Sequence, residues 1–145
     1  MTSAPTAERS TTTTTATAPQ RSTSRLYRVL IGLSSLAVLL QALWAGLFVH
    51  EGEDYKQSWV EVHARGGEIA ILLAAAATVT TFVKMRDRRE LLIGSAALTV
   101  LLVFEAYLGG LIGDSPAVTV LHFPLAMALM ALAVWLPLRA RSAGR

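Results

Sequence analysis

The sequence predicts an all-α membrane protein, a bundle of four transmembrane helices built from two helical hairpins. Hydrophobic residues make up 53% of the 145 residues, charged residues make up 16%, and the mean hydropathy is +0.49. An average soluble domain carries about 25% charged residues. Four apolar stretches each approach the roughly 20 residues that cross a bilayer. This composition excludes an ordinary soluble enzyme, and the lack of cysteine excludes a disulfide scaffold and a thiolate metal site.

The first apolar stretch covers residues 26–49 and follows a segment of different composition. Residues 1–25 are almost entirely Thr, Ser, Ala and Pro, and they carry too few apolar side chains to fold, so we predict a disordered cytoplasmic tail. The stretch is too long for the apolar core of a signal peptide, and no A-x-A-like cleavage site follows it. We therefore expect a membrane domain over 26–138, followed by a short cytoplasmic tail at 139–145.

The other apolar stretches cover residues 63–83, 91–112 and 117–138. Backbone amides in lipid must bond within their own segment, so each stretch is predicted to be a helix. Residues 50–62 are acidic, and we expect them to form a loop on the outer face. Residues 113–116 are expected to form a short turn on the same face.

The basic residues indicate how the bundle is oriented. Eleven of the thirteen Lys and Arg residues precede the first stretch or lie at its start, lie between the second and third, or follow the fourth, and only Lys56 and Arg65 lie on the other side. The positive-inside rule then places both termini in the cytoplasm of a multi-pass protein of the cell membrane. The basic clusters are short and close to the membrane, so they do not indicate nucleic-acid binding despite a pI near 9.8.

The two halves of the sequence are similar. Each contains a polar residue in its first helix, a glycine five residues later, a histidine near the start of its second helix, and a small residue four positions further on. These residues are Gln41, Gly46, His63 and Gly67 in the first half and Glu105, Gly110, His122 and Ala126 in the second. Parallel repeats of this kind pack about an axis along the membrane normal, as two hairpins of one four-helix bundle.

The two histidines are the main candidate site residues. His63 and His122 are predicted at comparable depth on helices that lie diagonally in the bundle. Two imidazoles placed in this way face each other across the bundle axis and can hold a haem iron from both sides. We predict bis-histidine ligation of haem b, with Gly67 and Ala126 leaving room for the porphyrin and Arg65 or Lys56 neutralising its propionates.

Polar residues inside the apolar stretches are further candidates. Ionisable groups in the hydrocarbon region are costly and are functional-site hypotheses by default. Glu68 and Glu105 are candidates for proton relay beside a redox centre. An interhelical hydrogen bond that holds the bundle together is the alternative, and it suits Gln41 best.

Two classes of function remain open. The first is a haem b-binding, cytochrome-like protein for electron transfer or haem handling, with a redox partner in the membrane and no assigned enzymatic activity. The second is a non-catalytic four-helix membrane protein that associates with lipid or with other helices, including a second copy of itself, through its small residues. A proton-coupled carrier has less support, because no helix is visibly broken in the middle of the membrane.

The histidine segments also resemble a known family. Residues 105–112 with 119–122 resemble the helix–loop–helix that carries a ligand histidine in haem A synthase, and residues 61–67 resemble the start of that family's second helix. The resemblance covers about 30–138, one four-helix half of that enzyme, and implies haem-ligand histidines at His63 and His122. The family has glutamate three residues before the histidine and arginine directly after it, whereas both offsets are two here. Small four-helix membrane proteins of bacteria are similar as well.

Overall fold

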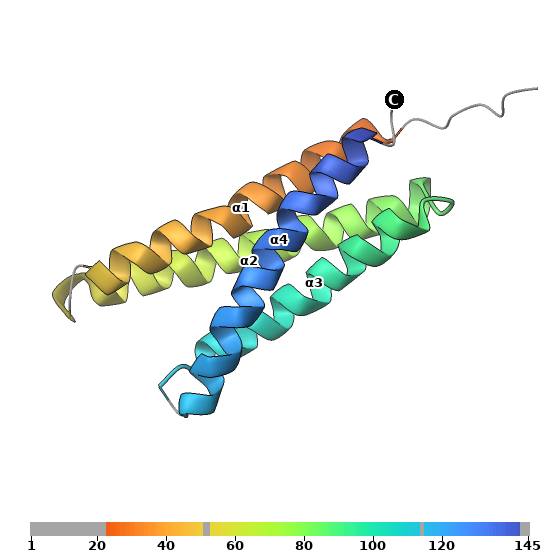
Figure 1. Ribbon diagram of the computed structural model, residues 1–145. Coiled ribbons are helices and arrows are strands. Elements are labelled where there is room, and N and C mark those ends of the chain that lie inside the picture. Colours follow the sequence, from red (N-terminus) through yellow and green to blue (C-terminus); the bar gives the residue numbers. More distant parts are fainter. Residues whose placement is uncertain (1–22, 51–52, 114, 143–145) are drawn as a thin grey trace, which may run out of the picture.

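The described part of the chain consists mainly of four long α-helices (Figure 1). The structure, a computed structural model, describes residues 23–50, 53–113 and 115–142. The helices are α1 (Arg25–His50), α2 (Glu53–Lys84), α3 (Arg89–Gly110) and α4 (Pro116–Ser142). The described residues contain no strand, and all four helices are long and apolar enough to cross a membrane. Over the described residues, the predictions of an all-α fold and of four helices with the length and composition to cross a membrane are confirmed.

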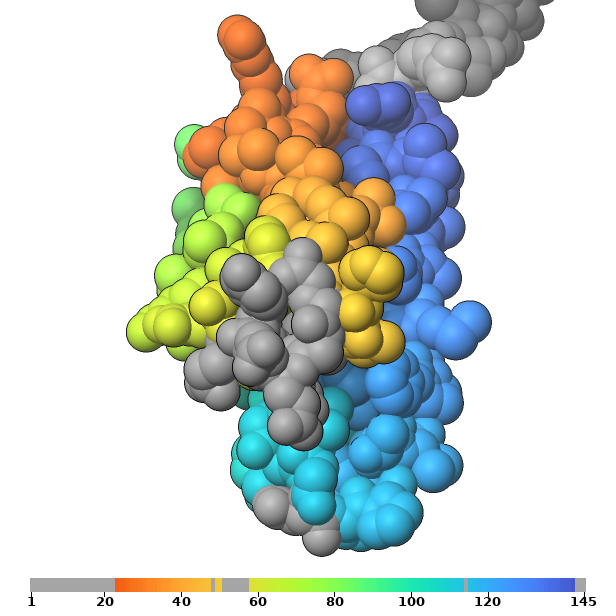
Figure 2. All heavy atoms as spheres, turned by 90° about the vertical axis from the view of Figure 1, so that its left-hand side faces the viewer, coloured from red at the N-terminus to blue at the C-terminus, as the bar shows by residue number. Residues whose placement is uncertain are grey.

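The four helices alternate in direction and pack in a closed ring (Figure 1). Each helix packs against the next one in the chain, and α1 packs against α4. The C-terminal end of α1 and the adjoining N-terminal end of α2 diverge from the C-terminal end of α3 and the adjoining N-terminal end of α4. Figure 2 views the bundle from the side on which these four helix ends lie, and it shows the adjoining ends of α3 and α4 well below those of α1 and α2. The bundle is therefore splayed at one end.

The buried side chains lie at the other end. With the exception of Leu108, every buried hydrophobic residue in the described chain falls within three ranges, which we call the packed half: residues 25–38, 70–102 and 129–142. The rest of the described helices and turns form the open half: residues 39–50, 53–69, 103–113 and 115–128. Many large apolar side chains of the open half, such as Leu43, Phe104 and Met127, are exposed. Such a surface suits a lipid environment.

Hydrogen bonds between helices reinforce the packed half. In lipid, such bonds contribute about 0.6 kcal/mol each on average. They join α1 to α3, α1 to α2, α1 to α4, and α2 to α3. The pairs are Tyr27 Oη–Ser95 Oγ between α1 and α3 (3.0 Å), Ser34 Oγ–Ala70 O between α1 and α2 (3.1 Å), Ser35 Oγ–Ala133 O between α1 and α4 (2.6 Å), and Thr78 Oγ1–Thr99 Oγ1 between α2 and α3 (3.1 Å).

Two helices extend well beyond the spans predicted from the sequence, whereas α1 and α3 agree with theirs to within two residues at each end. Helix α2 begins at Glu53, ten residues before the predicted start, and His50 belongs to α1. The predicted loop is therefore wrong for residue 50 and residues 53–62, and residues 51–52 lie outside the described part of the chain. Residues 53–62 are less apolar than the rest of α2, but they contain no glycine or proline that would end a helix. Helix α4 continues to Ser142, four residues beyond the predicted span. Most of the predicted disordered tail, residues 1–22, lies outside the described part of the chain.

Candidate functional site

The second histidine, His122, lies near the start of α4 against α3. Its Nδ1 atom is 3.1 Å from Oε1 of Glu105, and each of the two side chains is only 12% exposed. The contact is a close approach rather than a well-aligned hydrogen bond, and neither carboxylate oxygen has a hydrogen-bond partner in the described chain. Gly109 makes room for the ring, because a Cβ atom there would lie 3.3 Å from Cε1 of His122. Glu105 and Gly109, one helical turn apart, form the surface on which His122 rests.

The first histidine, His63, lies on α2 against α1 and is partly buried. Its Nδ1 atom is 3.2 Å from the backbone oxygen of Gln41. The Gln41 side chain donates a hydrogen bond from Nε2 to the backbone oxygen of Ala37, at 3.1 Å. It occupies space that a larger residue at position 66 would need, since a Cβ atom on Gly66 would lie 2.5 Å from Nε2. His63 thus contacts the backbone of the polar residue with which the sequence repeat aligns Glu105.

The two histidines therefore have corresponding surroundings. In each pair of consecutive helices, the histidine of the second helix turns Nδ1 toward an oxygen of the polar residue in the first. The oxygen is a neutral backbone carbonyl for His63 and a carboxylate for His122. Histidine ligands of metals commonly have one ring nitrogen held by such an oxygen while the other faces the metal.

The small residues predicted beside the histidines are partly accessible. Gly67 and Ala126 are each partly buried, and a Cβ atom added to Gly67 would have no neighbour within 4 Å. The same open space surrounds Gly46 and Gly110. These glycines do not serve close packing within the chain. Gly66 and Gly109 do serve close packing, because they leave room for the side chains of Gln41 and His122. From the sequence alone, they could not be distinguished from other glycines that allow helices to pack closely.

The two other predicted site residues pair with each other. Nη1 of Arg65 lies 3.1 Å from Oε2 of Glu68, one turn along the same helix, and the two side chains are 67% and 60% exposed. Arg65 is two residues from His63, about 200° around the helix. Glu68 thus lies on the exposed face of α2, while Glu105 is largely buried beside His122. Within the described ranges, no three His, Asp or Glu side chains gather where they could hold a metal ion.

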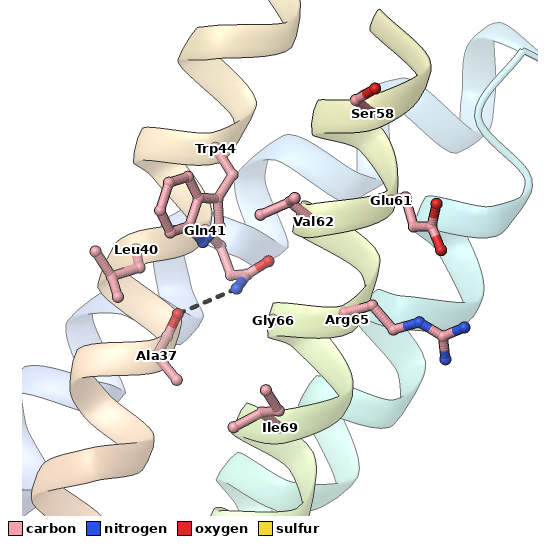
Figure 3. A pocket seen from close by; sticks show the side chains of 10 residues that line it. All are labelled: Ala37, Leu40, Gln41, Trp44, Ser58, Glu61, Val62, Arg65, Gly66 and Ile69. Atoms are coloured by element: carbon pink, nitrogen blue, oxygen red, sulfur yellow. Dashed lines mark hydrogen bonds between the residues drawn. The ribbon is translucent and has the colours of Figure 1, made fainter.

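A groove that the sequence did not reveal runs between α1 and α2 (Figure 3). It has a volume of about 570 Å³ and lies on the face of this pair turned away from α3 and α4. At one end, the rings of Trp44 and Trp59 stack with centroids 5.9 Å apart and planes at 10°. The lining residues are Ala37, Leu40, Gln41, Trp44, Ser58, Glu61, Val62, Arg65, Gly66 and Ile69.

Comparison of the chain with protein-family models, curated proteins and solved structures finds no match.

Proposed function

We propose that this chain is an integral membrane protein that binds haem b between His63 and His122, and that it serves electron transfer or haem handling. The observation that carries the proposal is the repeated contact of each Nδ1 atom with an oxygen of the preceding helix. An oxygen beside Nδ1 can orient an imidazole and, where it accepts a hydrogen bond, fix its tautomer, as in many histidine ligands of metals. Two axial histidines close the iron to substrates, which favours electron transfer over oxygen chemistry.

The contacts between helices support a binding site in the open half. Both histidine contacts join helices of the same consecutive pair, α1 to α2 and α3 to α4. In the packed half, hydrogen bonds also cross from one pair to the other, at Ser35–Ala133 and at Thr78–Thr99. On this proposal the pairs are two hairpins, tied together at one end and separable at the end where a flat cofactor enters.

The residues present fit such a cofactor. The donor set is two imidazoles, one from each pair of consecutive helices, and the open space at Gly67 is one turn from His63. Bound haem would supply a one-electron carrier. His63 and His122 would hold it, and Gln41 and Glu105 would orient the two rings. The resemblance to haem A synthase implies the same histidines, but four helices correspond to half of that enzyme, and the proposal does not include the synthase activity.

The proposed membrane arrangement follows from the charges. The packed half adjoins the basic termini and the basic turn between α2 and α3. With these in the cytoplasm of the cell, as the positive-inside rule requires, the open half and both histidines lie toward the outer leaflet. Arg65 is then an exposed cation on the outer side of the bundle, already paired with Glu68.

The experiment that tests the proposal is the absorption spectrum of the full-length protein, expressed with ample haem and purified in detergent. We expect a Soret band, and we expect His63→Ala and His122→Ala each to abolish or shift it. His50→Ala is the matched control, because His50 is exposed at the end of α1, and it should leave the spectrum unchanged. A protein without a Soret band, or histidine variants with the wild-type spectrum, would contradict the proposal.

Two glycine variants, compared with the histidine variants, test the alternative function, which is association through helix surfaces. Gly46 and Gly110 have open space where a side chain would extend, so they do not pack within the chain. If Gly46→Leu or Gly110→Leu dissociates an oligomer while both histidine variants behave as wild type, the protein acts through helix association instead. Analytical ultracentrifugation in detergent measures this outcome.

A further inference from the structure

The groove between α1 and α2 opens toward the surroundings of the bundle rather than toward its interior. Its lining comes from these two helices alone, and α3 and α4 lie behind them (Figure 3). Ile69 in the lining is 54% exposed, and the neighbouring Leu43 is 51% exposed. Its volume of about 570 Å³ lies within the usual range of small-molecule sites. In a membrane, a ligand of this groove would arrive from the lipid.

A buried hydrogen-bond acceptor faces this groove. The Gln41 side chain extends from α1 toward α2 between the lining residues (Figure 3). Its Nε2 atom is satisfied by the backbone oxygen of Ala37, but Oε1 is buried without a hydrogen-bond partner in the described chain. An unmet buried acceptor costs about 1–3 kcal/mol. Because Oε1 is covered in the described chain, the Gln41 side chain would have to rotate to present it to an O–H or N–H donor in the groove, and the new hydrogen bond would remove this cost.

The charges at the rim disfavour an anionic ligand. Arg65 is the cation in the lining, and its Nη1 atom already pairs with Glu68 at 3.1 Å. Glu61, also in the lining, lies near enough to interact with the same guanidinium. Two carboxylates around one guanidinium make this rim net negative, so a phosphate group would be repelled. A neutral head group is favoured.

An aromatic surface completes the site. Trp44 lines the groove, and its stacking on Trp59 holds the indole in place. Flat rings pack well on such a face, and offset aromatic stacking contributes about 0.5–1.5 kcal/mol beyond the area buried. At the other end of the groove, Ala37, Leu40 and Ile69 offer an apolar track for a hydrocarbon tail.

We propose that this groove binds a quinol, a neutral lipid-soluble ring that carries hydroxyl groups and an apolar tail. One hydroxyl donates a hydrogen bond to Oε1 of Gln41, the ring packs beside Trp44, and the tail extends past Leu40 and Ile69. The backbone oxygen of Gln41 contacts Nδ1 of His63 at 3.2 Å, so the ring would lie next to the residue that orients a proposed haem ligand. Its role as electron donor rests on the proposed function, whereas the binding itself does not.

The test compares the reduced and oxidised forms of one ligand. The full-length protein in lipid nanodiscs is titrated with a radiolabelled short-tailed hydroquinone and, separately, with the corresponding quinone. We expect the hydroquinone to bind about tenfold more tightly, because only this form can donate a hydrogen bond to Oε1 of Gln41. Gln41→Leu should remove this preference. Equal affinities for the two forms in the wild-type protein would overturn the proposal.

Two further variants locate the binding. Ile69→Trp fills the groove and should abolish binding of both forms. Val79→Trp, at a position on the same helix that is 61% exposed and outside the groove, should leave both affinities unchanged. Hydroquinone binding that survives Ile69→Trp contradicts the proposed site. So does a groove that retains co-purified phospholipid and binds no hydroquinone.

The absorption spectrum of each sample separates this proposal from the haem proposal. Hydroquinone binding in a protein without a Soret band would support the groove and contradict the haem site. A Soret band without hydroquinone binding would do the reverse.

Discussion

The packed half and the open half contain parts of the same four helices but differ in what holds those helices together. In the packed half, Tyr27, Leu98 and Leu136 are fully buried, and side-chain hydrogen bonds link α1 to each of the other helices. In the open half, the polar contacts of His63 and His122 link each helix to its neighbour in the same pair. The chain fills its own interior at one end, and it places its histidines at the end that it does not fill.

Lipid explains why this difference is tolerated. Between helices in a membrane there is no hydrophobic driving force, since lipid tails are as apolar as leucine, so close packing and hydrogen bonds must hold the bundle together. The packed half supplies both. The open half is then available for a ligand without the stability of the whole bundle depending on it.

The largest expected effect is overpacking in the packed half. A Cβ atom on Gly94 would lie 2.8 Å from Cδ2 of Leu136, so Gly94→Leu must displace α4 and should lower the free energy of unfolding by about 3 kcal/mol. Gly67→Leu, in the open half, meets no atom within 4 Å at its Cβ and should leave the stability of the haem-free protein unchanged. Unfolding in sodium dodecyl sulfate, followed by circular dichroism, measures both. Equal losses would show that the two halves are packed alike.

A cavity in the packed half should have the next largest effect. Leu98 is completely buried on α3. Leu98→Ala should lower the free energy of unfolding by about 2 kcal/mol. In lipid, little is lost by transferring the removed carbon atoms to an apolar environment, so most of this cost comes from the cavity that the substitution leaves. Val103→Ala, on the same helix but 51% exposed, should cost less than about 0.5 kcal/mol. The same unfolding titration tests the pair, and a cost at Val103 as large as at Leu98 would contradict the assignment of Val103 to the open half.

Removing one interhelical hydrogen bond should have a smaller effect. The Ser35 hydroxyl lies 2.7 Å from the backbone oxygen of Ile31 and 2.6 Å from that of Ala133 on α4. Ser35→Ala should cost about 0.6 kcal/mol, the average for such bonds in membranes. Ser58→Ala, at an exposed position in the open half, is the control and should not change stability. A neutral Ser35→Ala would mean that this hydrogen bond contributes nothing to holding α1 on α4.

The smallest effect is expected at the ion pairs. Arg139 and Glu90 join α4 to α3 at 2.7 Å, with side chains 44% and 40% exposed. Arg139→Gln should cost about 0.5 kcal/mol or less, and the loss should shrink as salt screens the pair. Arg65→Gln, which breaks a pair within one exposed helical face, should show no measurable change. A salt-independent loss for Arg139→Gln would indicate packing rather than charge.

Much of the candidate site could be predicted from the order of residues along the chain. Aligning the halves picked out Gln41 with His63 and Glu105 with His122, and the structure brings both pairs into contact. The alignment of the two halves did not reveal that Gln41 contacts His63 through its backbone oxygen while its side chain lines a groove. That difference depends on how α1 is rotated about its own axis, which residue spacing does not specify.

The sequence by itself determined the number of helices and their approximate spans, because the thickness of a bilayer and the need to satisfy backbone amides leave few alternatives for long apolar stretches. It did not determine where α2 begins, since hydropathy reports membrane depth and a helix can extend beyond the membrane. Only the tertiary structure decided that Arg65 pairs with Glu68, that Gly109 receives His122, and that one end of the bundle is open. These features depend on the rotation and crossing angle of each helix, which are set by packing between residues far apart in the chain.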